Sequence, residues 1–195
     1  MRTLHATTPI ITAACLLALL SSPLAAQTAA PVAVGNANIT EAEVLGAQKA
    51  WGEALVRIAR DYEDGGHAKA KATAAAVIDG AYGYQFGPVL FKPTLTVAPQ
   101  TFRTTREGAL AYFVGGDTAF PADTGFALKG WRTVEVANSA ILLQGDTAMT
   151  LGKVTMTDKH GNRTEVDKTW AYRKDDRGQL RIVVHHSSLP YTTAK

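Results

Sequence analysis

Cysteine is nearly absent from this sequence of 195 residues: the chain has one, Cys15. Cys15 lies in an apolar N-terminal segment, so the rest of the chain carries no thiol. This excludes a disulfide, a thiolate nucleophile and a cysteine metal ligand from the folded part of the protein. A large excess of charge is also absent, because 20 lysines and arginines stand against 17 aspartates and glutamates. With no basic run in the sequence, nucleic-acid binding is not expected.

The N-terminal segment has almost no charge and only a short hydrophobic run. Arg2 is the only formally charged residue before Glu41, and the apolar residues are followed by small ones up to Ala26. This order is typical of a secretory signal peptide and predicts cleavage after Ala26. The run is too short to span a bilayer comfortably, so we expect no membrane attachment once the leader is removed. The predicted organisation of this periplasmic or secreted protein is a signal peptide over 1–26, a flexible lead-in over 27–39 and a single domain over 40–195.

The first half of the domain has the spacing of helices. Thr40 and Glu43 form a capping box, and apolar residues then recur at steps of three and four. The sequence "EDGG" ends this pattern, and an alanine-rich segment follows it. A second capping box, Thr104 with Glu107, precedes a short apolar segment that ends at two glycines. The predicted helices cover residues 41–62, 67–79 and 105–114.

From Trp131 onward the hydrophobic period changes to two, which is typical of strands. The turn sequences "QGD", "DKHGN" and "DDRG" separate the strands. An earlier short strand is expected near 89–96. Helices followed by consecutive hairpins predict an α+β fold, in which the N-terminal helices pack on one face of a curved antiparallel sheet. The predicted hairpin strands cover residues 131–143, 147–157, 163–173 and 180–188.

The last predicted strand ends in four polar residues, in the sequence "RIVVHHSSLPY". Side chains alternate across a strand, so Arg181, Val183, His185 and Ser187 are expected on one face. His186 and Ser188 are expected on the other face, in sheet packing or a dimer interface. Polar groups buried on the inner face need partners or water, and a curved sheet closed by helices forms a pocket where such groups converge.

A metal site is not favoured by the distribution of histidines. Adjacent histidines in a regular strand point to opposite faces and cannot bind one metal together. Outside the leader the chain has only His67 and His160 in addition, one in a predicted helix and one in a predicted turn. No carboxylates have a recognisable ligand spacing either.

Four segments together resemble the iota-class carbonic anhydrases, members of the NTF2-like (SnoaL-like) superfamily. They are "GPVLFKPT", "GALAYFVGGD", "GDTAMTLGKVTMTD" and "IVVHHSSLPY", in the order of the family, and the resemblance covers about residues 47–191. It implies a cone of curved antiparallel sheet closed by helices, and a homodimer formed through the sheet. It also implies that the protein interconverts carbon dioxide and bicarbonate.

The resemblance further assigns a pocket with three hydroxyls, those of Thr94, Tyr112 and Ser187, with His185 nearby. All four are expected to be catalytic, and the three hydroxyls are also expected to bind substrate. No cofactor is expected, although the family includes members assigned zinc or manganese, which remain the alternative. In the expected mechanism the hydroxyls hold a water molecule that attacks carbon dioxide, while His185 accepts or relays the proton.

Two other functions remain open at this point, because the fold alone does not fix function. One is isomerase or cyclase chemistry on a small organic ligand, which usually requires a carboxylate inside the cone. None of the candidate acids is clearly placed there by the pattern; these are Asp79, Glu107, Asp117, Glu165 and Asp167. The other is a non-catalytic periplasmic module for binding or dimerisation.

Overall fold

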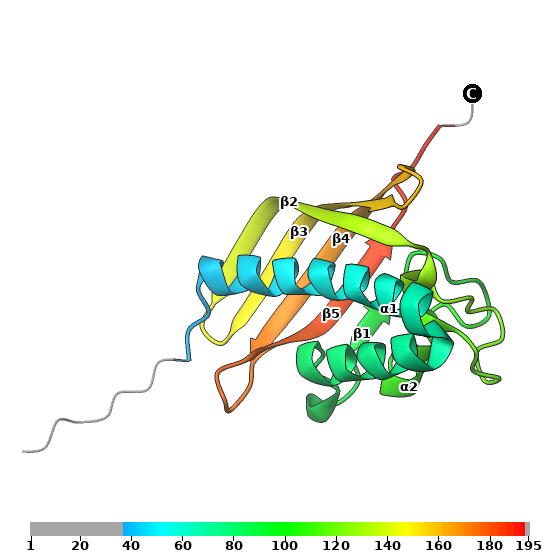
Figure 1. Ribbon diagram of the computed structural model, residues 1–195. Coiled ribbons are helices and arrows are strands. Elements are labelled where there is room, and N and C mark those ends of the chain that lie inside the picture. The colour runs from blue at the N-terminus through cyan, green and yellow to red at the C-terminus, as the bar shows by residue number, and fades with distance from the viewer. Residues whose placement is uncertain (1–36, 194–195) are drawn as a thin grey trace, which may run out of the picture. The chain divides into compact units, whose positions relative to one another are not determined.

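The computed structural model describes residues 37–193 (Figure 1). The expected signal peptide and residues 27–36 of the lead-in lie outside the described residues. The helices are α1 (Glu41–Ala81) and α2 (Arg106–Val114), with short 3-10 turns η1 (Tyr84–Phe86) and η2 (Phe126–Leu128). The strands are β1 (Leu90–Lys92), β2 (Trp131–Gln144), β3 (Thr147–Asp158), β4 (Arg163–Lys174) and β5 (Leu180–Ser188).

The first two predicted helices are confirmed as two segments of α1. The Thr40 side chain accepts a hydrogen bond from the Glu43 amide and completes the expected capping box. Gly66 has a φ of 71° and interrupts the helix. Glycine adopts this left-handed conformation without a steric penalty, so the chain turns there. The second segment then returns alongside the first, as Figure 1 shows.

The start of α2 differs from the prediction by one residue. Thr105, not Thr104, is the N-cap, and its hydroxyl accepts a hydrogen bond from the Gly108 amide at 3.1 Å. Both threonines are suitable caps, and the local pattern alone could not separate them. The helix ends as expected before Gly115, which has a φ of 65°.

The five strands form one sheet in the order β1-β5-β4-β3-β2. The four predicted hairpin strands are confirmed to within one residue at each end. The expected antiparallel pairing holds for β2 to β5, whereas at one edge β1 pairs with β5 in parallel. β1 is also shorter than predicted, because Pro93 has no amide hydrogen for the ladder and the chain turns at Thr94. The α+β class, with helices on one face of a curved sheet, is confirmed.

The core lies between the sheet and the helices. The first half of α1 crosses one face of the sheet (Figure 1), and its Trp51, Leu55 and Ile58 are buried there. The opposing side chains of β3 and β4 include Val154 and Val166, which are also buried. The other face, called the open face below, is covered by no helix of residues 37–193 (Figure 1). No helix within residues 37–193 has the length and apolar character needed to cross a bilayer.

β5 departs from regular alternation at Val183. Tyr172 of β4 pairs with Ile182, whereas the next residue back, Ala171, pairs with Val184. Val183 is thus an extra residue in β5, a β-bulge. The prediction that Val183 shares a face with His185 is therefore wrong, because the bulge shifts the alternation and Ile182 is buried in the core instead.

Candidate active site

Beyond the bulge, β5 directs His185 and Ser187 into the protein. Both are almost fully buried, whereas His186 is exposed on the open face and Ser188 is half-buried. The alternation predicted for these four residues is thus correct. His185 pairs with Trp170 of β4 and Ser187 pairs with Lys168. Because paired residues on adjacent strands point to the same face, Lys168 also points inward.

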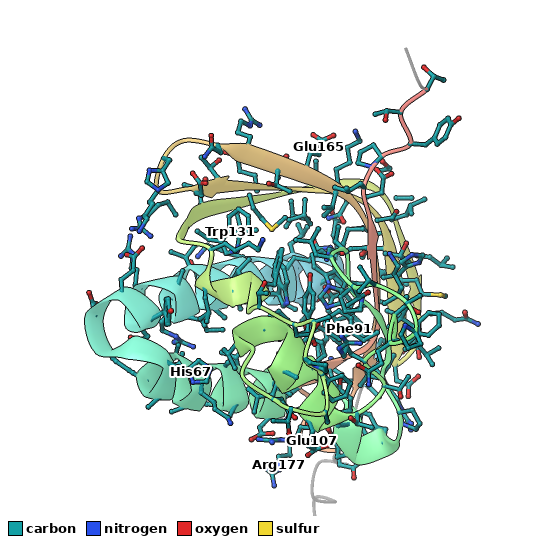
Figure 2. The ribbon with its side chains drawn as sticks, turned by 90° about the vertical axis from the view of Figure 1, so that its right-hand side faces the viewer. His67, Phe91, Glu107, Trp131, Glu165 and Arg177 are labelled. Carbon is teal, nitrogen blue, oxygen red and sulfur yellow. The ribbon has the colours of Figure 1, made fainter. Side chains whose placement is uncertain are left out.

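All four residues proposed from the sequence line one small cavity between the sheet and α2. Thr94 comes from the turn after β1, Tyr112 from α2, and His185 and Ser187 from β5. The cavity has about 10 Å³ of free space, on the order of what one water molecule requires. The remaining lining is mostly apolar: Trp51, Phe91, Pro93, Phe113, Phe126, Met156, Val166 and Lys168. In Figure 2, Phe91 lies between the sheet and the helices.

Lys168 is the residue of this cavity that the sequence analysis missed. Its Nζ lies 2.7 Å from His185 Nε2 and donates a hydrogen bond to Ser187 Oγ at 2.8 Å. It also lies 5.1 Å from the ring centroids of Trp51 and Trp170. None of the described residues that line the cavity is an acid. Lys168 therefore has no carboxylate to neutralise it at this site.

Burial shifts the pKa values of both basic groups downward. Removal of water from around Lys168 lowers its pKa from 10.5 to about 7. The pKa of His185 lies well below its ordinary value, first because of burial and second because Lys168 is close. Both shifts favour the uncharged forms, and at neutral pH the imidazole is therefore neutral.

Tyr82 and Trp51 position the imidazole of His185 through its other ring nitrogen, Nδ1. Tyr82 Oη lies 2.8 Å from His185 Nδ1, and Trp51 Nε1 donates to the same oxygen at 3.1 Å. A protonated lysine has only donors, so His185 Nε2 must accept from Lys168. The ring proton of His185 then resides on Nδ1 and is donated to Tyr82 Oη. This assignment follows from the contacts of the two ring nitrogens.

Tyr112 and Thr94 line the same cavity and lie close together. Burial raises the pKa of Tyr112 well above its ordinary value, so its hydroxyl stays protonated. Backbone groups of Leu95 and Thr94 hydrogen-bond the Tyr112 side chain and oppose this shift in part. Tyr112 therefore supplies a neutral hydroxyl beside the turn that carries Thr94.

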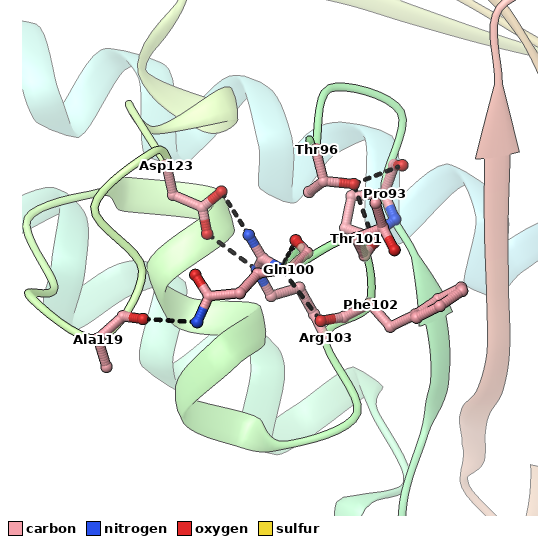
Figure 3. Close-up of polar contacts among 8 residues, drawn as sticks. All are labelled: Pro93, Thr96, Gln100, Thr101, Phe102, Arg103, Ala119 and Asp123. Atoms are coloured by element: carbon pink, nitrogen blue, oxygen red, sulfur yellow. Dashed lines mark hydrogen bonds and ion pairs between the residues drawn. The ribbon is translucent and has the colours of Figure 1, made fainter. Parts of the chain in front are cut away.

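The loop that carries Thr94 is held by polar contacts on both sides (Figure 3). Thr96 Oγ1 donates to the Thr101 carbonyl at 2.9 Å, which closes the turn. Arg103 forms two hydrogen bonds with the Asp123 carboxylate, from Nε at 2.9 Å and from a terminal nitrogen at 2.7 Å. Both side chains of this ion pair are 2% exposed. The pair joins the loop after β1 to the loop after α2, and so fixes Thr94 relative to Tyr112.

A signal for Lys168 was present in the sequence. On β4 it lies two residues from Val166 and two from Trp170, so strand alternation places it on the buried face. A lysine is rarely buried without a partner, and such an isolated charge on an apolar face indicates a functional site. Tyr82 carried no comparable signal, because its contact with His185 joins residues 103 positions apart.

The described part of the chain holds no cluster of three or more histidine, cysteine, aspartate or glutamate side chains suited to a metal ion. The donors around the cavity are hydroxyls, one amine and one imidazole. This set lacks the several anionic or imidazole ligands that zinc or manganese requires in proteins. The residues present therefore do not fit the metal alternative.

Three comparisons with known proteins identify the family of this chain. The family model described as "Metal-independent carbonic anhydrase" matches residues 42–189. A metal-independent carbonic anhydrase from Nostoc sp. (strain PCC 7120 / SAG 25.82 / UTEX 2576) is 67% identical over 156 residues, which cover 80% of this chain and 76% of the relative. The crystal structure of a cyanobacterial iota-carbonic anhydrase complexed with bicarbonate has 63% identity and a TM-score of 0.82, over 84% of this chain and 100% of that one.

A putative dehydratase of the NTF2-like family from Streptomyces avermitilis is a more distant structural match, with 15% identity and a TM-score of 0.47 over 77% of this chain and 96% of that one. The family match extends over most of the described residues and includes every residue of the cavity. The family's description as metal-independent confirms the expectation of catalysis without a metal. The chain belongs to the metal-independent carbonic anhydrases, the iota class of these enzymes.

Proposed function

We propose that carbon dioxide is hydrated to bicarbonate in the cavity lined by Thr94, Tyr112, Lys168, His185 and Ser187. One observation carries this proposal: the Lys168 amine contacts both Ser187 and His185 inside a small, acid-free cavity. A cavity of this size suits a small substrate better than the organic ligand of an isomerase or cyclase. The related iota-carbonic anhydrase was crystallised with bicarbonate, which supports the same ligand here.

The walls of the cavity suit the two reactants differently. Carbon dioxide is apolar and uncharged, and the rings of Phe91 and Phe126 with the side chains of Met156 and Val166 provide an apolar surface for it. Water and bicarbonate need hydrogen-bond partners, which the hydroxyls and the amine provide. The two kinds of surface meet in one cavity. Its free space is on the order of one water molecule, so the lining side chains must move apart for carbon dioxide to enter beside a held water.

The Lys168–Ser187 pair provides a route for the proton. Before attack, the neutral Lys168 amine accepts from the Ser187 hydroxyl, and the Ser187 oxygen accepts from the water. As the water attacks carbon dioxide, its proton passes to Ser187 and the Ser187 proton passes to Lys168. Afterwards the Lys168 ammonium donates to the Ser187 oxygen, and the Ser187 hydroxyl donates to bicarbonate. His185 accepts an N–H of Lys168 in both states and keeps the amine in place.

Tyr112 and Thr94 stabilise the charge that develops on the substrate oxygens. The Tyr112 hydroxyl is buried and protonated, so it donates without being ionised itself. Preorganised donors of this kind are worth about 3 kcal/mol each in a site without bulk water. Zinc enzymes instead lower the pKa of a metal-bound water. Here Lys168 accepts the proton, and the hydroxyls stabilise the negative charge on the substrate oxygens.

Stopped-flow hydration of carbon dioxide by the Lys168→Met variant tests this proposal. Removal of the proton acceptor is expected to lower kcat by about 10²–10⁴-fold. Lys153→Met is the matched control, because Lys153 is exposed and pairs with Glu165 on the open face. Full activity of Lys168→Met in the folded protein would refute the proposed role of the amine.

We also propose that the enzyme is a homodimer formed through the open face of the sheet. The registers of the strands align Leu142, Met149, Ala171, Val184 and Leu90 in one row across all five strands. Leu142 and Leu90 are 57% and 62% exposed in the single chain. A continuous apolar row of this extent is typical of an interface, and a two-fold axis through it pairs the row with itself.

Light scattering of the native protein and of Met149→Lys tests the dimer. The native protein is expected at twice the mass of one chain, and the charged variant is expected to shift to the monomer. Lys153→Met, four residues from Met149 on the same strand, should remain dimeric. A native monomer at micromolar concentration would refute this interface.

Export is the remaining expectation from the sequence. We propose that residues 1–26 direct the chain to the periplasm or the medium and are removed there, because the segment has the order of charge, apolar run and small residues of a signal peptide. The N-terminal residue of the protein recovered from the periplasm tests this. Recovery in the cytoplasm with Met1 intact would contradict it.

A further inference from the structure

We propose that Lys168 is also a covalent carbon dioxide site, where its amine forms a carbamate. This goes beyond hydration and rests on the proposed function in one respect, namely that carbon dioxide reaches this cavity. Three features of the geometry support it: an uncompensated buried amine, a proton acceptor in contact with it, and donors that face the product.

The amine has the environment that this reaction requires. Carbon dioxide adds only to an unprotonated amine, and a nearby carboxylate would keep the lysine charged. Lys168 is 4% exposed, and the described residues that line its cavity include no acid. The titratable groups that face it are His185 from β5 and Tyr112 from α2, both neutral at neutral pH; α1 contributes only Trp51. Burial lowers the lysine pKa to about 7, which agrees with this environment.

The contacts of the amine leave its lone pair available. A neutral amine has two hydrogens, and Lys168 has two acceptors, His185 Nε2 at 2.7 Å and Ser187 Oγ at 2.8 Å. When the Ser187 hydroxyl turns its hydrogen away from the nitrogen, the amine donates both of its hydrogens, and the lone pair remains for the carbon of a molecule in the cavity. The hydration step uses the other arrangement, in which the Ser187 hydroxyl donates to the amine. An exposed lysine such as Lys153 differs, because Glu165 beside it raises its pKa and keeps it protonated.

The reaction balances with groups already in the cavity. The lone pair of Lys168 forms a bond to the carbon of carbon dioxide, and one C–O π bond breaks to give an anionic oxygen. The nitrogen then loses one proton to His185 Nε2, which is the acceptor in contact with it. The carbamate anion replaces the lysine charge that helped to lower the pKa of His185, and so favours the imidazolium. The product is a carbamate anion beside an imidazolium cation. The hydroxyls of Ser187, Tyr112 and Thr94 face the same cavity and can donate to the carbamate oxygens.

An enzyme molecule whose Lys168 is a carbamate cannot hydrate carbon dioxide. The nitrogen of a carbamate has no available lone pair for the proton of an attacking water. Its carboxylate also occupies the space that bicarbonate needs. A carbamylated molecule is therefore inactive until it releases carbon dioxide, so the modification would oppose hydration when carbon dioxide is abundant.

Chemical trapping in the mature enzyme tests directly whether Lys168 forms a carbamate. The protein is equilibrated with carbon-13-labelled carbon dioxide at mildly alkaline pH, and triethyloxonium then converts any carbamate to a stable ethyl ester. After digestion, mass spectrometry should find the labelled ethoxycarbonyl group on Lys168. We expect its occupancy to exceed that of Lys153 in the same digest by on the order of 100-fold, because neutral amine is far scarcer on an ordinary lysine.

Two variants separate this proposal from the proposed function. Ser187→Ala keeps the amine and should retain label on Lys168 while it loses hydration activity. Lys168→Arg should lose the label at this position, since a guanidinium stays protonated. An active native enzyme without label on Lys168, or with equal label on Lys153, overturns the carbamate and leaves the hydration site unaffected. Label on Lys168 in a native enzyme without hydration activity would support the carbamate and refute the proposed function.

Discussion

Lys168 and Ser187 face each other on adjacent strands, and the lysine Nζ lies 2.8 Å from the serine Oγ. Strand register fixes this pair, so no loop movement is needed to form it. The contact joins the group whose pKa is near neutrality to the hydroxyl that faces the cavity. A site of this kind can move a proton without a metal-bound water. Its parts can be tested one at a time.

Removal of the Ser187 hydroxyl should abolish most of the activity. We expect Ser187→Ala to lower kcat by about 10²-fold, because one preorganised group that contacts the reacting atoms is lost. Thr94→Ala should act in the same direction. Stopped-flow hydration measures both. Ser188→Ala is the matched control, because Ser188 lies on the opposite face of β5, and a similar loss there would contradict the assignment by face.

Removal of the Tyr112 hydroxyl should slow the reaction with little effect on folding. Tyr112→Phe retains the ring that stacks on Phe126 at 5.3 Å between centroids. The lost donor is expected to cost about 10²-fold in kcat. Tyr191→Phe, at a tyrosine that is 90% exposed, provides the control. Equal activity of native enzyme and Tyr112→Phe would show that this hydroxyl does not contact the transition state.

The stability of the protein should depend on pH through Lys168. In the unfolded chain this lysine holds its proton up to about 10.5, whereas in the folded chain it loses it near 7. Between these values the unfolded state binds more protons, so the free energy of unfolding should rise with pH by about 1.4 kcal/mol per unit. Above pH ~10 the buried tyrosines act in the opposite direction, because their pKa values are raised.

Urea denaturation at several pH values measures this slope. The Lys168→Met variant should lack the rise, since no titrating amine remains at the position. Lys153→Met should keep it, because Lys153 is exposed in the folded protein as well. A native protein whose unfolding free energy is flat from neutral to mildly alkaline pH would contradict a neutral buried amine.

The buried Arg103–Asp123 pair should be important for stability. Asp123→Asn leaves the Arg103 guanidinium buried without an anion, which is expected to cost about 3–5 kcal/mol. Glu165→Gln breaks the exposed pair with Lys153 and should cost no more than about 1 kcal/mol. Chemical denaturation compares the two variants. Equal losses would indicate that the buried pair is accessible to water.

Chelation should leave the activity unchanged. The family is metal-independent, and the described residues contain no cluster suited to a metal ion. Hydration rates before and after prolonged dialysis against a strong chelator should therefore agree. Elemental analysis of the same sample is the control, because loss of activity together with loss of stoichiometric zinc or manganese would contradict this expectation.

The sequence was sufficient for the hairpin strands and for the alternation of His185 and His186, because both depend on local period and turn residues. It was not sufficient for the parallel pairing of β1 with β5, which joins residues more than 90 positions apart. The roles of Tyr82 and Lys168 also depend on distant contacts. The N-cap of α2 was missed for a different reason, since two adjacent threonines satisfy the same local rule.

The extra residue at Val183 has a consequence for how this site tolerates change. If β5 paired regularly from Ile182 onward with that side chain still in the core, His185 and Ser187 would emerge on the solvent side of the sheet. The face of the sheet on which His185 and Ser187 lie therefore depends on the β-bulge at Val183, which is outside the cavity. Substitutions at Val183 that favour regular pairing of β5 with β4 would abolish activity, although every catalytic side chain is still present.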